Sequence, residues 1–405
     1  MKILQVNMVH RVKSTGRTCW ELDEYLKANG HESVTAYGHG ALYDDGSYRI
    51  NSNFEYYMHN VLSRLTGLEG YFSYFATKRF LRFVKKYDPD IIHLRNLHGH
   101  YLNFPLLFKF LKKTQKPVVM HLHDCWIFTG KCAHPIYNHC DKWLSECKNC
   151  PSKKAYPSSW LFDFSKKMFK DKKKWLSSLK NVRVVGVSDW TAGEGRRSFL
   201  GAFPVSRIYN WIDTKKFYRR EGCSPKDFGL DEDKFTVICV GASWTLDNPK
   251  YQDVLKLADK LDDDMQILLV GAATEPVEHK RIVYAGFTND IEKLAKMYSV
   301  GDVYIHLSNA DTFGKVIAEA MACGLPAIVY DVTACPEIAG NECGFAVKYR
   351  DIDAMVEKIR LIKASDKSDY VRACIDKVNR DFDYETNCKL TEQFYKEFLE
   401  SVNKQ

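Results

Sequence analysis

Short apolar runs alternate with helical patterns along all 405 residues, and this alternation constrains the fold more than any other feature. Residues 3–8 form the first apolar run, and a helical pattern through Trp20 and Leu26 follows it. The other strand candidates of the first half are residues 33–37, 91–94, 118–122, 182–187 and 207–209. Strands separated by helices predict an α/β fold with parallel sheets, whose ligands bind at the carboxyl ends of the strands.

The second half of the chain repeats this scheme. Its strand candidates are residues 235–240, 266–270, 282–285, 303–307 and 327–330. A chain of this length is too long for one small core, so we expect two Rossmann-like domains, at residues 1–213 and 214–383. The polar segment 214–232 would connect them, and residues 384–405 are a further helix candidate. We expect the active site in the cleft between the two domains.

Two carboxylates, Asp311 and Glu319, lie eight positions apart in the stretch DTFGKVIAEAMACGLP, residues 311–326. An apolar run precedes this stretch and a helical apolar face ends at Gly324, so the expected order is strand, tight turn and helix. The backbone N–H groups around residues 312–315 would then lie at a helix N-terminus, which favours an anion. Glu319 would lie about one turn into the helix, within reach of a ribose or sugar hydroxyl. An ordinary amphipathic helix with two solvated acids is the alternative.

This stretch resembles the E-x7-E signature of retaining glycosyltransferase family 4. The resemblance implies the GT-B fold, with the acceptor bound mainly by the first domain and the donor by the second. It implies a catalytic Asp311 that holds the donor sugar together with Phe313, Gly314 and Lys315, and a Glu319 that holds the nucleotide ribose. Asp311 is one methylene shorter than the usual glutamate, a change that would shift donor preference without abolishing binding.

The sequence HLHDCW, residues 121–126, places polar side chains at the carboxyl end of a predicted strand. His121 and His123 share one face of that strand, so the periodicity does not choose between them. The family resemblance favours His123 as the catalytic histidine that contacts the donor sugar. A hydrogen-bonded structural histidine is the alternative.

Gly16 lies in the predicted loop after the first strand, residues 14–17. A side chain there would block the close approach of the backbone to a phosphate. An ordinary turn explains a single glycine about as well. The family usually has a glycine-containing loop at this place, so the resemblance implies that Gly16 binds the donor.

The donor diphosphate usually meets two cations in this family, an arginine and a lysine at the start of a helix. Here only Lys250 is in register, while Pro249 takes the arginine position and Tyr251 a glycine position. The diphosphate would therefore depend on Lys250 and on the amides near Gly314; the alternative is a solvated surface lysine. Residues 209–213 and 286–305 also resemble family segments, and the family fold implies that the helix at 384–405 packs back on the first domain.

Four of the thirteen cysteines follow the HLHDCW strand with the spacing C-x7-C-x6-C-x2-C, inside a predicted cysteine-rich loop at residues 125–151. They are Cys132, Cys140, Cys147 and Cys150. Four thiolates at this spacing can close a tetrahedral zinc site, which would stabilise a loop that is expected to have no core of its own. Reduced unligated cysteines, or a disulfide or redox pair, are the alternatives. A site closed by four thiolates has no open position, so we expect structural zinc and no catalytic cofactor. Similar insertions occur in family members that resemble colanic-acid and other exopolysaccharide transferases.

The charge is unevenly distributed along the chain. Residues 1–220 carry 37 Lys and Arg against 18 Asp and Glu, whereas the remainder carries 22 against 33, which gives +19 and −11. Basic residues alternate with aromatic ones at residues 78–87 and 165–180. Such a surface attracts anionic lipid headgroups or nucleic acid, although either run alone reads equally well as a solvated helix face. The imbalance between the two halves favours association with an anionic membrane surface over a solvated helix face. We expect no nucleic-acid partner.

No signal peptide and no run of about 18 apolar residues is found, so we expect a cytoplasmic protein with peripheral association at the inner face of the plasma membrane. The family resemblance implies a hexosyltransferase-type glycosyltransferase (EC 2.4). It would move a sugar from a nucleotide-diphosphate donor to a saccharide acceptor. We expect the acceptor to be lipid-linked and the product to belong to a surface polysaccharide. The resemblance implies retention of anomeric configuration. The alternatives are a sugar-nucleotide 2-epimerase and a non-catalytic protein that binds nucleic acid or membrane on a decayed GT-B scaffold.

Overall fold

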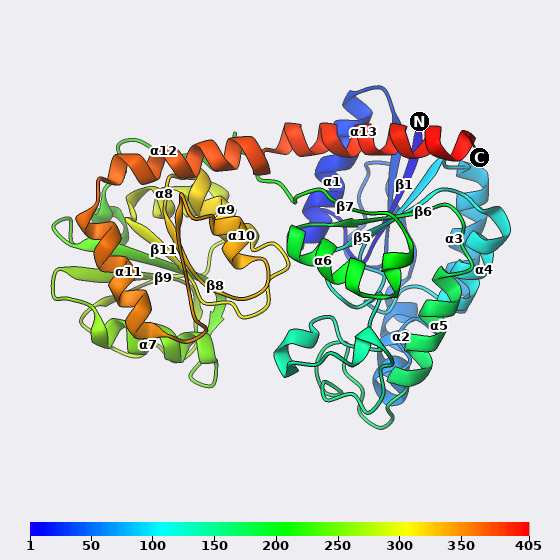
Figure 1. The fold of residues 1–405 in the computed structure, drawn as a ribbon, viewed down its shortest axis with the longest axis horizontal. Helices are drawn as coiled ribbons and strands as arrows, with labels where there is room; N and C mark the ends of the chain where they lie inside the picture. Colours follow the sequence, from blue (N-terminus) through cyan, green and yellow to red (C-terminus); the bar gives the residue numbers. More distant parts are fainter. Residues whose placement is uncertain (405) are drawn as a thin grey trace. The chain divides into compact units, whose positions relative to one another are not determined.

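The computed structural model describes residues 1–404, which form two compact units (Figure 1). The N-terminal unit contains Met1–Ile208 and the chain from Cys388 onward, and the C-terminal unit contains Tyr209–Asn387. Both unit boundaries lie within a few residues of positions 213 and 384, where the sequence placed them.

A seven-stranded parallel sheet forms the centre of the N-terminal unit, in the order β3-β2-β1-β4-β5-β6-β7. The strands are β1 (Lys2–Asn7), β2 (Glu32–Tyr37), β3 (Tyr48–Arg49), β4 (Ile91–Leu94), β5 (Val118–Leu122), β6 (Val182–Gly186) and β7 (Val205–Arg207). Because β1 pairs with β2 on one side and with β4 on the other, the order in which strands are added to the sheet reverses at β1. In doubly wound sheets ligands bind at this point, outside the carboxyl ends of the strands.

The helices of this unit are α1 (Lys13–Ala28), α2 (Asn53–Thr66), α3 (Tyr74–Tyr87), α4 (Phe104–Thr114), α5 (Ser165–Leu176), α6 (Asp189–Arg197) and, from Cys388 onward, α13 (Tyr384–Asn403). A capping box between Ser52 and Glu55 starts α2. Helix α13 packs on the unit through Tyr395, whose hydroxyl lies 2.5 Å from His93 Nδ1, and through Phe398, over which Arg183 lies.

A six-stranded parallel sheet, in the order β10-β9-β8-β11-β12-β13, forms the centre of the C-terminal unit. Its strands are β8 (Phe235–Trp244), β9 (Met265–Ala273), β10 (Ile282–Gly286), β11 (Val303–His306), β12 (Ala327–Tyr330) and β13 (Gly344–Val347). Its helices are α7 (Pro249–Lys260), α8 (Ile291–Val300), α9 (Lys315–Ala322), α10 (Cys335–Ala339), α11 (Ile352–Ala364) and α12 (Lys367–Lys377). The apolar side chains of β8, β9 and β11 pack against α7 and α11 in one buried cluster.

The predicted α/β class with parallel sheets is confirmed, and β4, β5 and β12 have the expected bounds. Two strands escaped prediction. Strand β3 has only two residues, and β13 begins at Gly344, whose Cβ would lie 1.9 Å from the Ala327 carbonyl oxygen. Such short or glycine-led strands lack the apolar run on which strand prediction depends.

The predicted loop at residues 14–17 is wrong, because α1 already begins at Lys13 and Gly16 lies inside it. A Cβ on Gly16 would meet the Val9 carbonyl oxygen and the Val9 Cγ2 atom at 3.1 Å. The glycine therefore allows the first turn of α1 to pack closely on the chain that leaves β1. Its small size has a structural explanation that does not require a phosphate.

The expectation that the cysteine-rich loop has no core is also wrong. Trp126, Phe128 and Trp143 are buried and belong to the main apolar cluster of the N-terminal unit. Regular structure is sparse here: the chain between β5 and α5 contains two 3₁₀ turns, Pro135–Asn138 and Lys142–Leu144 (Figure 1). The segment is thus held by a few large aromatic anchors rather than by backbone ladders.

Candidate functional site

The turn between β11 and α9 carries most of the residues that the sequence singled out. Asp311 follows β11, and Gly314 precedes the first residue of α9, Lys315. Gly314 has φ 75° and ψ 58°, and a Cβ there would lie 2.7 Å from Ile317 Cδ1. Only glycine adopts this left-handed conformation without strain. The positive end of the α9 dipole consequently lies beside the Asp311 carboxylate, as the strand–turn–helix pattern predicts.

Asp311 forms an ion pair with His306, which the sequence analysis missed. The two side chains meet at 2.5 Å between Nε2 and Oδ2, and His306 Nδ1 lies 3.0 Å from the Tyr304 hydroxyl. Burial opposes the charge on each group, but their mutual hydrogen bond holds the pKa of Asp311 at about 2 and raises the pKa of His306 to about 9. Asp311 is thus kept ionised. The sequence could have indicated His306, because it is the last residue of β11 and so lies at the same edge of the sheet as Asp311.

Lys250 lies in the first turn of α7, half-buried. Burial raises the pKa of Asp311, whereas His306 and, more weakly, the positive charge of Lys250 lower it. The Lys250 cation therefore faces the same edge of the sheet as Asp311. The neighbouring departures from the family pattern have structural roles. Pro249 occupies the first position of α7, where proline is favoured. Tyr251 is fully buried, with its hydroxyl 2.7 Å from that of Tyr284.

The side chains of Phe313 and Glu319 are both buried. Phe313 is 2% exposed and packs edge-to-face on Phe382, with ring centroids 5.3 Å apart. Its side chain therefore supports the turn from behind, which leaves its backbone as the part available to a ligand. Glu319 is 7% exposed on α9, in the second turn of the helix.

In the N-terminal unit, the carboxyl ends of β4 and β5 bring Arg95 and His123 together. Arg95 Nη1 lies 3.3 Å from His123 Nε2, and both residues are buried. Arg95 Nε and Nη2 have no hydrogen-bond partner among residues 1–404. His121 has a different environment, because its Nδ1 lies 3.0 Å from His93 Nε2 and the pair continues to Tyr395. Burial lowers the pKa values of His93 and His121 well below the usual range, so this chain is a neutral core network.

A second polar network joins the loop after β4 to Asp124, the residue that follows His123. His98 Nε2 pairs with Asp124 at 2.6 Å, and His98 Nδ1 lies 3.0 Å from the Tyr156 hydroxyl. Burial opposes ionisation of Asp124, but the charge of His98 holds its pKa at about 2. The sequence analysis missed His98, although the sequence LRNLHGHY also follows a predicted strand and could have been read like HLHDCW.

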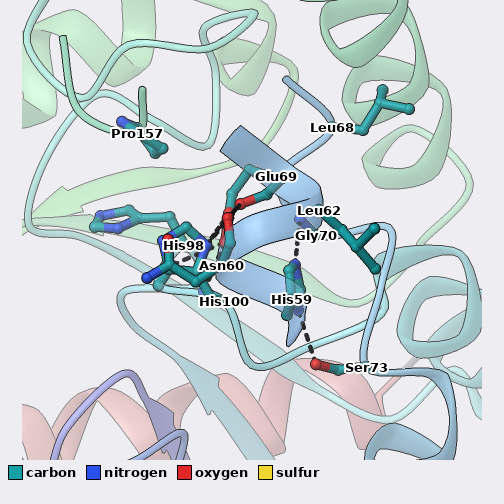
Figure 2. Close-up of polar contacts among 12 residues, drawn as sticks. His59, Asn60, Leu62, Leu68, Glu69, Gly70, Ser73, His98, His100 and Pro157 are labelled. Atoms are coloured by element: carbon teal, nitrogen blue, oxygen red, sulfur yellow. Dashed lines mark hydrogen bonds and ion pairs between the residues drawn. The ribbon is translucent and has the colours of Figure 1, made fainter. Parts of the chain in front are cut away.

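His100, Glu69 and His59 form a buried cluster next to this network (Figure 2). His100 Nδ1 lies 2.6 Å from Glu69 Oε2, and Glu69 Oε1 accepts the backbone N–H groups of Gly99 and His100 at 3.0 and 2.7 Å. Figure 2 shows His59 turned toward Ser73, with 2.7 Å between Nδ1 and Oγ. The donor atoms of the three residues lie within 4.8 Å of one another, as do those of His306, Asp311 and Cys335. The His100–Glu69 and His306–Asp311 pairs are bonded within their groups, whereas His59 bonds to Ser73 and to the Gly70 N–H.

The comparisons with known proteins agree with this arrangement. A family model described as Glycosyltransferase Family 4 matches residues 15–216, and one described as Glycosyl transferases group 1 matches residues 234–364. The curated relative named colanic acid biosynthesis glycosyl transferase WcaC, from Escherichia coli K12, is 23% identical over 275 residues, which is 66% of this chain and 66% of the relative's own length.

Two solved structures cover nearly the whole chain. Sucrose-phosphate synthase from Thermosynechococcus elongatus has a TM-score of 0.67 at 17% identity and covers 99% of this chain and 100% of its own. Alr3699/HepE from Anabaena, solved in complex with UDP and glucose, has a TM-score of 0.65 at 14% identity and covers 97% of this chain and 99% of its own. The fold is therefore GT-B, with two parallel-sheet Rossmann-like units. Together with the two family models, it shows that the chain belongs to glycosyltransferase family 4.

Proposed function

We propose that the protein is a hexosyltransferase-type glycosyltransferase (EC 2.4) that moves a sugar from a nucleoside diphosphate donor to a saccharide acceptor in surface-polysaccharide biosynthesis. The observation that carries this proposal is the β11–α9 turn. There, a carboxylate kept ionised by His306 lies beside the positive end of a helix, with the charge of Lys250 on the same edge. A carboxylate can accept sugar hydroxyls while the helix end and a cation hold phosphate.

The chemical demand of the reaction is the negative charge that develops on the leaving diphosphate. Lys250 and the N-terminus of α9 would offset this charge, Asp311 would hold the sugar, and Glu319 would hold the ribose. The usual arginine position holds Pro249, so we expect weaker stabilisation of the leaving group, by a few kcal/mol at most. Retention follows from the family: the acceptor hydroxyl would attack from the face that the diphosphate leaves. The role of His123 at the donor sugar stays a prediction.

The acceptor is proposed to be lipid-linked, because the N-terminal unit exposes a basic and apolar face. Helix α2 presents Phe54, Tyr57, Met58 and Val61 on one side, with exposed fractions of 73, 64, 45 and 48%. The exposed residues Trp160, Leu161 and Phe162 continue from it, since the Trp160 N–H donates to the Arg64 carbonyl at 2.7 Å. The neighbouring helix α3 adds Lys78, Arg79, Arg82, Lys85 and Lys86.

An apolar stripe flanked by basic residues binds the headgroup region of anionic membranes. No helix within residues 1–404 has the length and apolar character needed to cross a bilayer. Contact with the membrane would therefore be peripheral, at the face that carries α2 and α3.

The donor site is tested by thermal stabilisation of the protein with UDP, GDP, ADP and CMP and their sugar conjugates. A ligand at about 100 times its dissociation constant stabilises by about 2.7 kcal/mol, which shifts the melting temperature by a few degrees. We expect the nucleotides of one base to stabilise the wild type but not Glu319→Gln. The control is Glu357→Gln, whose altered residue is exposed on α11, and it should be stabilised like the wild type. If no nucleotide stabilises the protein, the donor site is wrong, and bound nucleic acid in the purified sample would favour the binding-protein alternative.

Membrane association is tested by co-sedimentation with phosphatidylcholine vesicles that contain or lack phosphatidylserine. We expect binding to the anionic vesicles that falls at least roughly tenfold in Phe54→Ser/Val61→Ser, since two exposed apolar side chains are removed. Leu390→Ser, which is 46% exposed on α13, is the matched control and should bind normally. Equal binding of all three proteins, or binding that ignores phosphatidylserine, would contradict the proposal.

A further inference from the structure

Four cysteine side chains line one small cavity in the segment between β5 and α5. The cavity has a volume of about 10 Å³, room for about one water-sized sphere, and its lining includes Cys132, Cys140, Cys147 and Cys150. Neither His134 nor His139 is among the residues that line it within the described chain, although both lie in the same segment. None of the four cysteines forms a disulfide in the described structure. The fold therefore selects four sulfur atoms from a segment that also offers two imidazoles.

The backbone around the cavity is arranged to approach sulfur. The Gly130 N–H donates to Cys147 Sγ at 3.1 Å. Gly130 permits this contact, because a Cβ there would lie 2.6 Å from the Cys147 Cβ. The Cys132 and Cys150 thiols are also close enough to interact with each other. Hydrogen bonds from the backbone to ligand sulfurs orient the ligands of metal sites and tune their basicity.

Two buried lysines flank the four thiols without a carboxylate partner. Lys131 and Lys172 are 3 and 1% exposed, and neither forms an ion pair with any residue from 1 to 404. Lys131 Nζ donates to the carbonyl groups of Ala155 and Pro157, and Lys172 Nζ to those of Trp126 and Thr129 at 2.6 and 3.1 Å. Buried cations are costly unless a negative charge lies nearby. Four thiolates around one Zn²⁺ carry a net charge of −2, which matches two ammonium groups.

We propose that Cys132, Cys140, Cys147 and Cys150 bind one structural zinc ion whose net negative charge is balanced by the buried lysines Lys131 and Lys172. All four zinc positions are then filled by protein sulfur, so the ion has no open position for substrate or water. The cavity is too small for a cluster of several metal ions.

The zinc site also reaches the polar network of the N-terminal unit. Lys131 binds the chain on both sides of Tyr156, through Ala155 and Pro157, and Tyr156 contacts His98. His98 in turn pairs with Asp124 at the end of β5. The ion would therefore fix the segment that holds Tyr156 over this edge of the sheet.

The test is the metal content of the full chain, purified without chelator and measured by elemental analysis. We expect one zinc per chain. Replacement by Co²⁺ should give thiolate-to-cobalt charge-transfer absorption and the strong visible bands of a tetrahedral site. Iron in place of zinc, or no metal after incubation with one equivalent of Zn²⁺, would overturn the proposal, as would a disulfide between any two of the four cysteines in mass spectra of the unreduced protein.

Single variants identify the ligands. Cys140→Ser and Cys150→Ser, at the two partly exposed positions, should each lose most of the zinc, whereas Cys223→Ser and His139→Ala should keep it. Full zinc content in Cys140→Ser and Cys150→Ser would overturn the assignment. Because a serine variant can misfold, the wild type is also stripped with a mercurial and a chelator and then refilled. Protease cleavage between residues 125 and 164 should increase on stripping and return to its original rate with Zn²⁺; unchanged cleavage would overturn the structural role.

Discussion

The β11–α9 turn of the C-terminal unit and the β4–β5 edge of the N-terminal unit are built in different ways. In the first, Asp311, Gly314 and Glu319 come from one continuous stretch, and His306 lies just upstream. In the second, His98, Asp124 and Tyr156 come from three separate loops that the sheet brings together. The comparison shows that a local motif can be read from spacing, whereas an assembled network requires the fold. It also predicts that single changes have larger and more specific effects in the first region.

The largest effect is expected for Asp311→Asn, which keeps the shape of the side chain but removes its charge. The proposed transfer activity should fall by roughly 100-fold or more, in line with the loss of a fixed electrostatic group at a reacting centre. Asp353→Asn, at an exposed position on α11, should retain full activity. If Asp311→Asn keeps activity within about twofold of wild type and an unchanged circular dichroism spectrum, the β11–α9 turn is not more sensitive to single changes than the β4–β5 edge.

The His306–Asp311 pair also predicts a dependence of stability on pH. The pKa of His306 is raised to about 9, so its contribution is complete below about pH 6.5 and is lost as the pH rises through 9. The pKa of Asp311 is lowered to about 2, so its contribution is lost only as the pH falls from about 4 toward 2. The wild type should lose more stability than Asp311→Asn between pH 7 and 9.5, in urea unfolding followed by fluorescence. Parallel pH profiles for the two proteins would show that the pair is not charged in solution.

A smaller effect on stability is expected for Gly314→Ala. Its backbone is left-handed and its Cβ would clash with Ile317, so the free energy of unfolding should fall by roughly 1–2 kcal/mol. Gly193→Ala is the matched control, because Gly193 lies inside α6 with nothing near its Cβ position. This control should be neutral or gain up to about 1 kcal/mol. Equal losses in both variants would show that the turn does not depend on glycine.

The smallest effect is expected for Tyr156→Phe in the assembled network. It removes the hydrogen bond of the hydroxyl to His98 at 3.0 Å and its weak donation to Met8 Sδ at 3.7 Å, and the remaining contacts of the network stay in place. The free energy of unfolding should fall by about 1 kcal/mol or less. Tyr57→Phe, at an exposed position on α2, serves as the control for loss of a hydroxyl. A loss well above that of Asp311→Asn would reverse the ranking of the two regions.

The alternating strands and helices were predictable because their apolar runs are long and regular. The β11–α9 turn was predictable for the same reason, since a strand, a glycine and an amphipathic helix follow one another without a gap. Gly16 shows the limit of such reading. One glycine after a strand fits a phosphate loop and a close helix packing equally, and only the distance to Val9 identified the packing.

His306 and His98 could have been singled out as strand-end residues, but which polar side chains pair with which was not predictable, because the partners come from separate parts of the sequence. Glu69 lies 31 residues before His100, yet it accepts the His100 backbone N–H at 2.7 Å. His121 and His123 have the same periodicity, and only the neighbours His93 and Arg95 distinguish a core histidine from one at the edge of the sheet. The spacing of the four cysteines suggested a shared site, which stays a prediction, but it gave no sign of the two buried lysines near the cavity that they line.

The most direct test of the proposed function is the release of nucleoside diphosphate from a panel of nucleotide sugars, with a lipid-linked saccharide extract as acceptor. The account predicts that one nucleotide sugar is consumed, that the acceptor gains one hexose by mass, and that Asp311→Asn loses this turnover while Asp353→Asn keeps it. Turnover that survives in Asp311→Asn, or nucleotide binding without turnover of any sugar, would contradict it.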